Sequence, residues 1–235
     1  MNGIERHIII GAGGTGSHLI APLIAYLNTR YESTQDWMLF IVDGDSVEKK
    51  NFERQLFQPA AIMRNKALAL ANQYSATRNV HAVQEYLSES NIDRLISDGD
   101  YVYICVDNYP VRALIEKYCA TLGNVVVING GNEKDTGSCQ IWIRKNGQDI
   151  TPKLSFLHPE ILAPGENRAE MTCQQIAELP GGEQLIVANM ASAMFMLTAL
   201  ISFHQKEELV WTEIQFDLGT NRVAIGMDQR EFMVN

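Results

Sequence analysis

The chain has 235 residues, a hydrophobic content of 46% and a formal net charge of -9. That length and apolar content suit a single domain spanning residues 1–235, and the acidic balance argues against nucleic acid or an anionic membrane as a partner. The four cysteines form no C-x-x-C pair, so we expect neither a zinc knuckle nor a disulfide framework. A strand pattern begins within about six residues of the start, too early for a signal peptide, and predicts a cytoplasmic protein.

Strand and helix patterns alternate from the start of the chain. Apolar runs of strand length predict strands at residues 6–10, 37–42, 80–86, 101–106 and 125–128. Helical patterns lie between them, at about residues 15–30 (where Pro22 should introduce a kink), 59–76, 92–96 and 110–122. Alternation of this kind predicts an α/β protein with a Rossmann-like, doubly wound and mostly parallel sheet.

The second half of the chain has a different pattern. Residues 139–144 alternate apolar and polar side chains, as an edge strand would, and residues 213–227 predict a hairpin of two antiparallel strands at the C-terminal end of the sheet. Between about residues 146 and 183, prolines and glycines interrupt any helical or strand periodicity of apolar residues. This stretch is predicted to be a long loop that crosses the active site or contacts a partner.

Residues 185–203 carry no charge and approach the length of a membrane span. Polar residues such as Asn189 and Ser192 interrupt the stretch, and the rest of the chain has the composition of a soluble protein. We therefore expect a buried helix, covered in part by a second subunit, and no membrane span.

The stretch "GAGGTGSH" follows the first predicted strand and places Gly11, Gly13 and Gly16 in a G-x-G-x-x-G pattern. Glycines let the backbone approach a phosphate, and the following helix directs its N-terminal N–H groups at the anion. Dehydrogenases, flavoproteins and enzymes that split ATP share this pattern. Asp43 ends the second strand, where an acid can accept hydrogen bonds from ribose hydroxyls; its alternative role is to cap a turn with Gly44.

Further motifs follow in a fixed order. The stretch "VDGDSVEKKNFERQLF" contains Asn51, Arg54 and Gln55, "RNKALAL" contains Lys66, and "CVDNYPVR" contains Asp107 followed by Asn108 and Arg112. This series resembles the ThiF/MoeB family of adenylating enzymes, which are related to ubiquitin-activating enzymes. The resemblance covers about residues 6–145 and resumes loosely at the apolar helix.

The resemblance implies that ATP activates a carboxylate, usually the C-terminal glycine of a ubiquitin-like or sulfur-carrier protein, as an acyl-adenylate. Arg54 would then bind the β and γ phosphates, Lys66 would neutralise the α and β phosphates, and Asp107 would hold Mg²⁺. Asn51 and Gln55 would orient the triphosphate. The remaining nucleotide contacts implied are Gly11, Gly13, Gly14, Gly16, Asp43, Asp45 and Asn108.

The resemblance also suggests Cys173, in "EMTCQQIAEL", as a nucleophile that forms a thioester, because Thr172 can cap a short helix whose dipole lowers the thiol pKa. A small buried hydrophobic role is the alternative for Cys173, and Cys139 is a weaker candidate nucleophile. A homodimer through the apolar helix and a downstream conjugating enzyme are further implied partners. The small size and the missing zinc motifs resemble those of compact bacterial ThiF proteins, of the PRTRC type or from ubiquitin-like cassettes.

Two departures from the family pattern matter. Many relatives bind structural zinc through two C-x-x-C pairs, which this chain lacks, so we expect no metal other than Mg²⁺. Relatives also often supply an N-terminal arginine to the partner subunit, whereas only five residues precede Arg6 here. That arginine is expected to be absent or to come from elsewhere.

Three alternatives remain open on sequence alone. An NAD-dependent oxidoreductase would share the glycine turn and Asp43 but would leave Arg54, Lys66 and Asp107 without a purpose. A catalytically inert scaffold subunit of an activating complex would keep the same fold. A relative that activates a carboxylate on modified tRNA is disfavoured by the net charge of -9.

Overall fold

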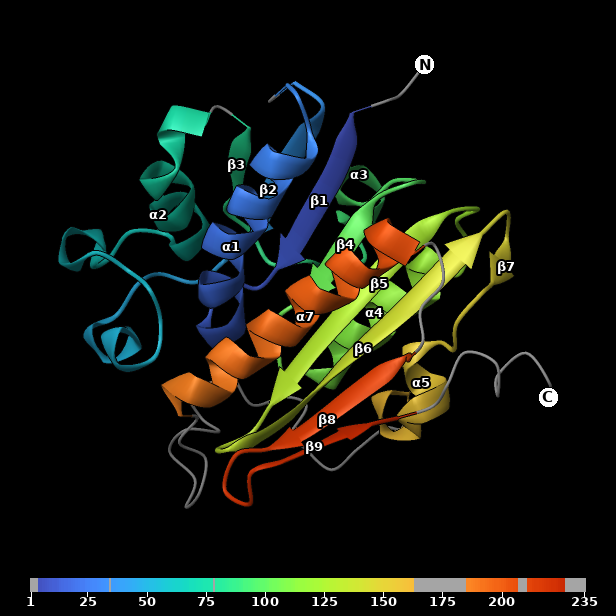
Figure 1. Ribbon diagram of the computed structural model, residues 1–235. Coiled ribbons are helices and arrows are strands. Elements are labelled where there is room, and N and C mark those ends of the chain that lie inside the picture. The colour runs from blue at the N-terminus through green and yellow to red at the C-terminus, as the bar shows by residue number, and fades with distance from the viewer. Residues whose placement is uncertain (1–3, 34, 78, 163–184, 207–210, 227–235) are drawn as a thin grey trace.

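The computed structural model describes residues 4–33, 35–77, 79–162, 185–206 and 211–226. Within these residues, nine strands form one sheet in the order β3-β2-β1-β4-β5-β6-β8-β9, with β7 paired to β6 (Figure 1). The strands from β3 to β5 pair in parallel, and those from β5 to β9 pair antiparallel. The mostly parallel Rossmann-like sheet with an antiparallel C-terminal end is therefore confirmed.

Parallel strands covered on both faces need apolar residues at successive positions, and four of the five predicted apolar runs form such strands. The fifth, which begins at Val80, forms a strand at the edge of the sheet that is only partly buried. The bounds of the five strands are β1 Glu5–Ile10, β2 Trp37–Val42, β3 Val80–Val83, β4 Tyr101–Ile104 and β5 Val125–Asn132. After β1 the chain moves outward to β2 and β3 and then returns to β4 on the other side of β1. The carboxyl ends of β1 and β4 thus flank a topological switch point, where ligands bind in sheets of this kind.

Helices cover both faces of the sheet. On one face, α1 (Gly14–Arg30) and α7 (Ile186–Lys206) lie side by side (Figure 1), and on the other lie α3 (Ile92–Leu95) and α4 (Tyr109–Cys119). Two buried clusters result, one on each side, because alternate residues of every strand point to opposite faces. Helix α1 runs without a break through Pro22.

The helix expected at 59–76 is shorter than predicted. A 3₁₀ helix, Pro59–Ala61, comes first, and α2 then spans Lys66–Gln73, followed by a second 3₁₀ turn at Ser75–Thr77. Met63 adopts a φ of 64°, a left-handed conformation that interrupts a right-handed helix. The prediction was therefore wrong about where this helix begins.

The prediction that residues 139–144 form an edge strand is also wrong, because this strand lies inside the sheet. It belongs to β6 (Thr136–Lys145), which pairs with β5 on one side and with β8 (Glu213–Asp217) on the other. The edge is instead β9 (Arg222–Ile225), the second strand of the expected C-terminal hairpin.

The region expected to be a loop from 146 to 183 contains short elements in its described part. These are β7 (Gln148–Asp149), α5 (Leu154–Leu157) and a 3₁₀ helix, Pro159–Ile161. Residues 163–184 lie outside the described residues.

By length and composition alone, the segment Ile186–Gln205 could cross a membrane, and 44% of its most apolar stretch is buried within the molecule. The buried side packs on α1 and on strands β5 and β6. Large apolar residues on the other side are exposed at Val187, Met190 and Met194. Helix α7 therefore presents an apolar surface that the described residues leave exposed.

Candidate functional site

The glycine turn between β1 and α1 lies at the switch point. Gly11 has a φ of +98°, and a Cβ there would lie 3.0 Å from the carbonyl oxygen of Cys105, so β4 passes too close for any side chain. A Cβ on Gly16 would overlap the Gly11 carbonyl oxygen. Gly13 differs, because its Cβ would meet only the Gln55 Nε2, at 3.9 Å. The backbone at Gly13 is thus the part of the turn that a ligand can approach.

Helix α1 begins directly after this turn. The first backbone bond of the helix runs from the Ser17 N–H to the Gly13 carbonyl, at 3.0 Å, so the N–H groups of residues 14–16 have no acceptor within the helix. Ser17 Oγ accepts a bond from the Leu56 N–H at 3.2 Å, which fixes the loop with Gln55 beside the turn. These free N–H groups and the positive end of the helix dipole form a site suited to an anion.

Asp43 directly follows the neighbouring strand, β2, and faces the same turn. Its Oδ2 accepts from the Ala12 N–H at 2.6 Å and its Oδ1 from the Asp45 N–H at 2.7 Å. Burial raises the pKa of Asp43, although the charge of Lys66 and these two N–H bonds oppose the rise. Asp43 therefore ties the turn to β2 and still has lone pairs on both oxygens for a ligand hydroxyl.

Lys66 reaches the site as the first residue of α2. Asn65 caps this helix: its Oδ1 accepts from the Leu68 N–H at 3.0 Å, and its Nδ2 donates to the Asp43 carbonyl at 2.8 Å. The cap anchors the start of α2 to the end of β2. The Lys66 side chain, only 7% exposed, then points into the site and forms an ion pair with Asp45 Oδ2 at 3.0 Å.

Asp45 joins Lys66 to Tyr86, whose hydroxyl donates to the other carboxylate oxygen of Asp45. Burial raises the pKa of Asp45, but the bond from Tyr86 and the nearby Lys66 outweigh burial and hold that pKa below its usual value. The same hydrogen bond raises the pKa of Tyr86 to about 12. At neutral pH Asp45 is therefore a carboxylate and Tyr86 a phenol.

Asp107 follows β4 across the switch point. Its Oδ2 is buried and has no hydrogen-bond partner among the described residues, as is also true of Gln55 Oε1. Asn108 caps α4 by accepting from the Val111 N–H at 2.9 Å, which holds Asp107 at the mouth of the site. An unpaired buried carboxylate oxygen is costly unless a ligand or ion completes it, so these atoms fit a metal-bound polyphosphate.

One cavity of about 180 Å³ gathers most of the predicted residues. Eight of them line it: Gly11, Gly13, Asp43, Asp45, Gln55, Lys66, Asp107 and Asn108. Its apolar walls include Val42, Leu87 and Val111. Gly14 lines a smaller adjoining space that also contains Gly13 and Asp107.

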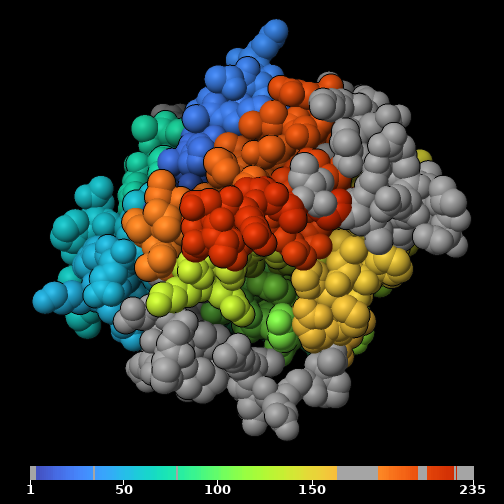
Figure 2. Space-filling view, turned by 60° about the horizontal axis from the view of Figure 1, so that its bottom comes forward, coloured from blue at the N-terminus to red at the C-terminus, as the bar shows by residue number. Residues whose placement is uncertain are grey.

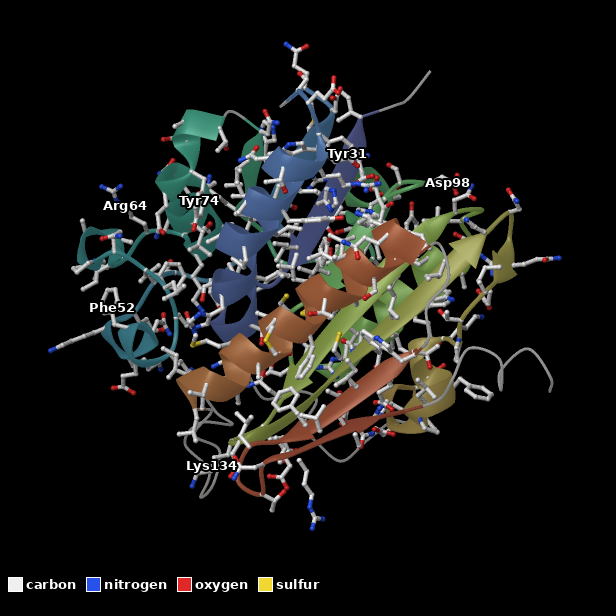
Figure 3. All side chains as sticks on the ribbon, viewed as in Figure 1. Tyr31, Phe52, Arg64, Tyr74, Asp98 and Lys134 are labelled. Carbon is white, nitrogen blue, oxygen red and sulfur yellow. The ribbon has the colours of Figure 1, made fainter. Side chains whose placement is uncertain are left out.

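The structure does not bring every predicted residue into that cavity. Gly16 packs inside the turn, and Asn51, which is buried, uses its Oδ1 to accept from the Glu48 N–H at 2.8 Å within the 3₁₀ helix Lys49–Glu53. Arg54 ends that 3₁₀ helix and is not among the described residues that line either space; its carbonyl accepts from His18 Nε2 at 3.2 Å. Phe52, labelled in Figure 3, marks this segment beside the start of α1.

Cys173 and Thr172 lie outside the described residues, so their predicted roles remain predictions. The described cysteines are Cys105, Cys119 and Cys139, all free, and burial raises the thiol pKa of each. None of these three is therefore a thiolate at neutral pH, which argues against Cys139 as a nucleophile.

Several side chains at the site were not predicted from sequence. Tyr86 lies just past a strand, and no local pattern indicated that its hydroxyl meets Asp45. Arg112 was part of a motif but had no assigned role. Its Nε and Nη2 both donate to the Val106 carbonyl, at 3.2 and 3.0 Å, and hold the guanidinium beside Asp107. Burial lowers the pKa of Arg112, while the charge of Asp107 raises it.

A second, larger cleft of about 500 Å³ begins at Arg112. It shares Arg112, Gly131 and Asn132 with the small space beside Asp107, and it extends between β8–β9 and the segment around His158. Figure 2 shows this face, with β8 and β9 in red, residues 154–162 in gold and green residues between them. His158 bridges Glu160 and Glu213, at 2.8 and 2.7 Å, and the bond to Glu213 raises its pKa.

Comparison with known proteins supports the series of motifs. The ThiF family model matches residues 5–225. This chain belongs to the ThiF family. Among curated relatives, the adenylyltransferase and sulfurtransferase UBA4 of Candida albicans is 30% identical over 135 residues, covering 56% of this chain and 29% of that protein. The SAMP-activating enzyme E1 of Haloferax volcanii is 27% identical over 199 residues, covering 82% of this chain and 67% of that protein.

Solved structures agree on the fold of this ThiF-family chain. The crystal structure of E. coli MccB with ATP has a TM-score of 0.70 at 16% identity, covering 94% of this chain and 63% of that one. The ThiF-family chain thus spans under a third of the UBA4 protein and about two thirds of the other two proteins.

Proposed function

We propose that this ThiF-family protein uses ATP and Mg²⁺ to adenylate the C-terminal carboxylate of a ubiquitin-like or sulfur-carrier protein. The observation that carries the proposal is the cavity at the glycine turn. There the Lys66 side chain lines the same cavity as Asp107 and Gln55, each of which has one buried oxygen with no hydrogen-bond partner among the described residues, next to the glycine turn that begins α1. The relatives support it, since their names describe adenylyltransferases and an E1 that activates SAMP proteins.

The lining of the cavity suits ATP along its whole length. Val42, Leu87 and Val111 offer apolar contact for a purine, Asp43 offers acceptors for ribose hydroxyls, and the N–H groups of residues 14–16 suit phosphate oxygens. The structure of MccB with ATP supports a nucleotide in this fold. Among the described residues no three metal-binding side chains converge, so Asp107 would hold Mg²⁺ together with phosphate oxygens and water.

The proposed reaction is an in-line substitution at the α-phosphorus. A carboxylate oxygen of the carrier forms a bond to that phosphorus, the bond to the bridging oxygen breaks, and pyrophosphate leaves with its electron pair. Charge grows on the phosphate oxygens, so cations held in place beforehand lower the barrier. Lys66 would supply such a charge on leaving Asp45, and Arg54 would supply a second from the neighbouring loop.

The carrier tail has a route to this site. The cleft beyond Arg112 shares Arg112, Gly131 and Asn132 with the space beside Asp107, and an extended C-terminal peptide would fit between β8–β9 and His158. Arg112, next to the junction, would attract the terminal carboxylate. We propose that the tail enters through this cleft.

The test is to mix the purified chain with ATP, Mg²⁺ and candidate carrier proteins, and to measure ATP–pyrophosphate exchange and the mass of the carrier. An AMP adduct on a carrier supports the proposal, and comparison of the wild type with Cys173→Ala would detect a thioester. Binding of NAD but not ATP would favour an oxidoreductase instead. ATP binding with no ATP–pyrophosphate exchange in the presence of any candidate carrier would favour an inert subunit.

We further propose that the chain forms a homodimer through the exposed apolar surface of α7. Met190 is 50% exposed and Met194 55%, which is unusual for large apolar side chains that lie in one row. Light scattering on the wild type and on Met194→Glu would test this proposal. A wild-type chain that is monomeric at micromolar concentration would contradict it.

A further inference from the structure

Asn189, in the first turn of α7, lies against the glycine turn although 175 residues separate it from Gly14. Its side chain is fully buried. A Cβ on Gly14 would lie 2.5 Å from Asn189 Cγ and 2.7 Å from its Nδ2, too close for any real contact. Position 14 therefore has to be glycine, because the Asn189 side chain occupies the space that a Cβ would need. The backbone of Gly13, in contrast, remains accessible from the cavity.

Asn189 is also one end of a chain of hydrogen bonds. Thr15 Oγ1 donates to Asn132 Oδ1 at 3.0 Å, and Asn132 Nδ2 donates to Asn189 Oδ1 at 3.1 Å. Both bonds run in one direction, so each polarises the next. Three elements, α1, β5 and α7, are thereby joined at the first turn of α1.

The backbone holds this arrangement in place. The Leu185 N–H donates to the Lys134 carbonyl at 2.9 Å, which ties the start of α7 to the β5–β6 turn; Figure 3 labels Lys134 there. Asn132 comes from the end of β5, just before that turn. Asn132 and Asn189 therefore have little freedom to move apart. Both line the small space that also contains Gly13, Thr15 and Asp107.

We propose that Asn189 is a positioning residue for the nucleotide: through its contact with Gly14 and through Asn132 and Thr15, it fixes the N–H groups at the start of α1 in the orientation that binds phosphate. The proposal rests on the proposed function, because it concerns the same ATP site. A turn that is ordered in advance binds its ligand more tightly than one that must be ordered on binding. Loss of Asn189 should therefore weaken ATP binding.

The first experiment measures the dissociation constant of ATP with Mg²⁺ by calorimetry on the full chain. Asn189→Ala should weaken binding about tenfold, the size expected when one buried hydrogen-bond partner is removed. The matched control is Ser192→Ala, one turn later in α7, whose buried hydroxyl has no partner among the described residues and lies beside Gly130 instead of Gly14. The control should bind ATP like the wild type.

The results separate the two proposals. A wild-type chain that binds no ATP would overturn the proposed function. A wild type that binds ATP, with Asn189→Ala binding equally well, would leave the function intact and overturn the role of Asn189. If Asn189→Ala does not fold, Thr15→Val removes the other end of the chain of hydrogen bonds at nearly constant volume, and it too should weaken ATP binding; wild-type affinity in that variant would count against the proposal.

A second experiment distinguishes positioning from mere stability. Gly14→Ala alone should lose ATP binding by well over tenfold, because the new Cβ overlaps Asn189. Adding Asn189→Ala removes the overlap, so the double variant should regain affinity to about that of Asn189→Ala alone. Urea unfolding of the same variants separates the two roles: a purely structural contact predicts that ATP affinity falls and recovers only in step with the free energy of unfolding. That result, or a double variant that binds no better than Gly14→Ala, would overturn the proposal.

Discussion

The two ends of the parallel strands both bury polar side chains, but they use them differently. At the amino ends, His7 Nε2 lies 2.9 Å from Glu5 Oε1 and His7 Nδ1 lies 2.8 Å from the Tyr103 hydroxyl. At the carboxyl ends, one buried oxygen each of Asp107 and Gln55 has no hydrogen-bond partner in the described part of the chain, and both residues line a cavity. Buried polarity alone therefore does not mark a binding site. Unpaired polar atoms that line a cavity do.

Most polar atoms of the amino-end cluster bond to one another; His204 Nε2, which has no hydrogen-bond partner among the described residues, lies 3.8 Å from Glu5 Oε1. Burial lowers the pKa of His7 despite its bond to Glu5, so the ring is neutral at pH 7 and accepts from Tyr103 while donating to Glu5. Tyr26 OH and His204 Nδ1 add a further bond at 2.9 Å. Tyr31, labelled in Figure 3, marks this end, opposite Lys134. We expect substitutions at the amino ends of the strands to change the stability of the protein, and substitutions at the carboxyl ends to change its binding and turnover of ATP.

The largest effect is expected at the carboxyl ends. Lys66→Ala and Asp107→Ala should each reduce ATP–pyrophosphate exchange by about 10²- to 10³-fold, roughly 3–4 kcal/mol, because each removes a charge held ready for the phosphates. Both variants should stay folded, since Asp45, the partner of Lys66, is 43% exposed and can be hydrated. Lys50→Ala, at an exposed ion pair with Glu48, is the control. Near-normal exchange in either site variant would refute its assigned role.

The amino ends should respond in the opposite way. Tyr103→Phe leaves the buried His7 Nδ1 without its hydrogen-bond partner and should lower the free energy of unfolding by about 1–3 kcal/mol. ATP affinity should not change. Urea unfolding and calorimetry together test this, and a variant with weakened ATP binding but normal stability would break the comparison between the two ends.

Acid should destabilise the protein through the same cluster. Burial lowers the pKa of His204 from 6.5 to about 4, so between these values the unfolded chain binds a proton that the folded chain does not. Stability should therefore fall as the pH is lowered from about 6.5 to about 4, by at most about 1.4 kcal/mol per pH unit for this one group. Thermal melting of the wild type and of His204→Gln across this range would test it; equal slopes would show that His204 is not responsible.

The smallest effect is expected for Tyr86→Phe at the carboxyl ends. Because Tyr86 is 65% exposed, this change should affect ATP binding with little effect on stability, which sharpens the comparison between the two ends. Without the hydroxyl, Asp45 should hold Lys66 more firmly, and ATP binding should weaken about threefold, as for one hydrogen bond. Stability should be unchanged. Calorimetry can resolve that difference, and a loss of stability instead would place Tyr86 with the structural cluster.

Local patterns predicted four of the five parallel strands well, because strands buried on both faces must be apolar throughout. The fifth, β3, lies at the sheet edge and ends at Val83, before the predicted residue 86. These patterns failed where contacts between residues distant in the sequence determine the bounds or the position of an element. Helix α2 begins at Lys66 and not near 59, since Met63 is left-handed and Asn65 supplies the cap. Strand β6 alternates apolar and polar side chains like an edge strand. It nevertheless has a neighbour on both sides, because β8, about 75 residues later in the sequence, pairs with the side that β5 does not occupy.

The same limit applies to the site. The ordered motifs and the family they resemble indicated Lys66, the first residue of α2, and Asp107, which closely follows β4 at the carboxyl edge of the sheet. They did not indicate Tyr86, Asn132 or Asn189, whose importance depends on which surfaces meet in space.

The sequence by itself determined the β-α-β start, the glycine turn and the order of charged motifs, because local sterics and hydrophobic periodicity act over a few residues. Only the tertiary structure decided which polar atoms remain unpaired and which distant side chain lies on Gly14. Such contacts depend on how whole elements pack, and the packing of α7 against α1 brings together residues that no local pattern relates.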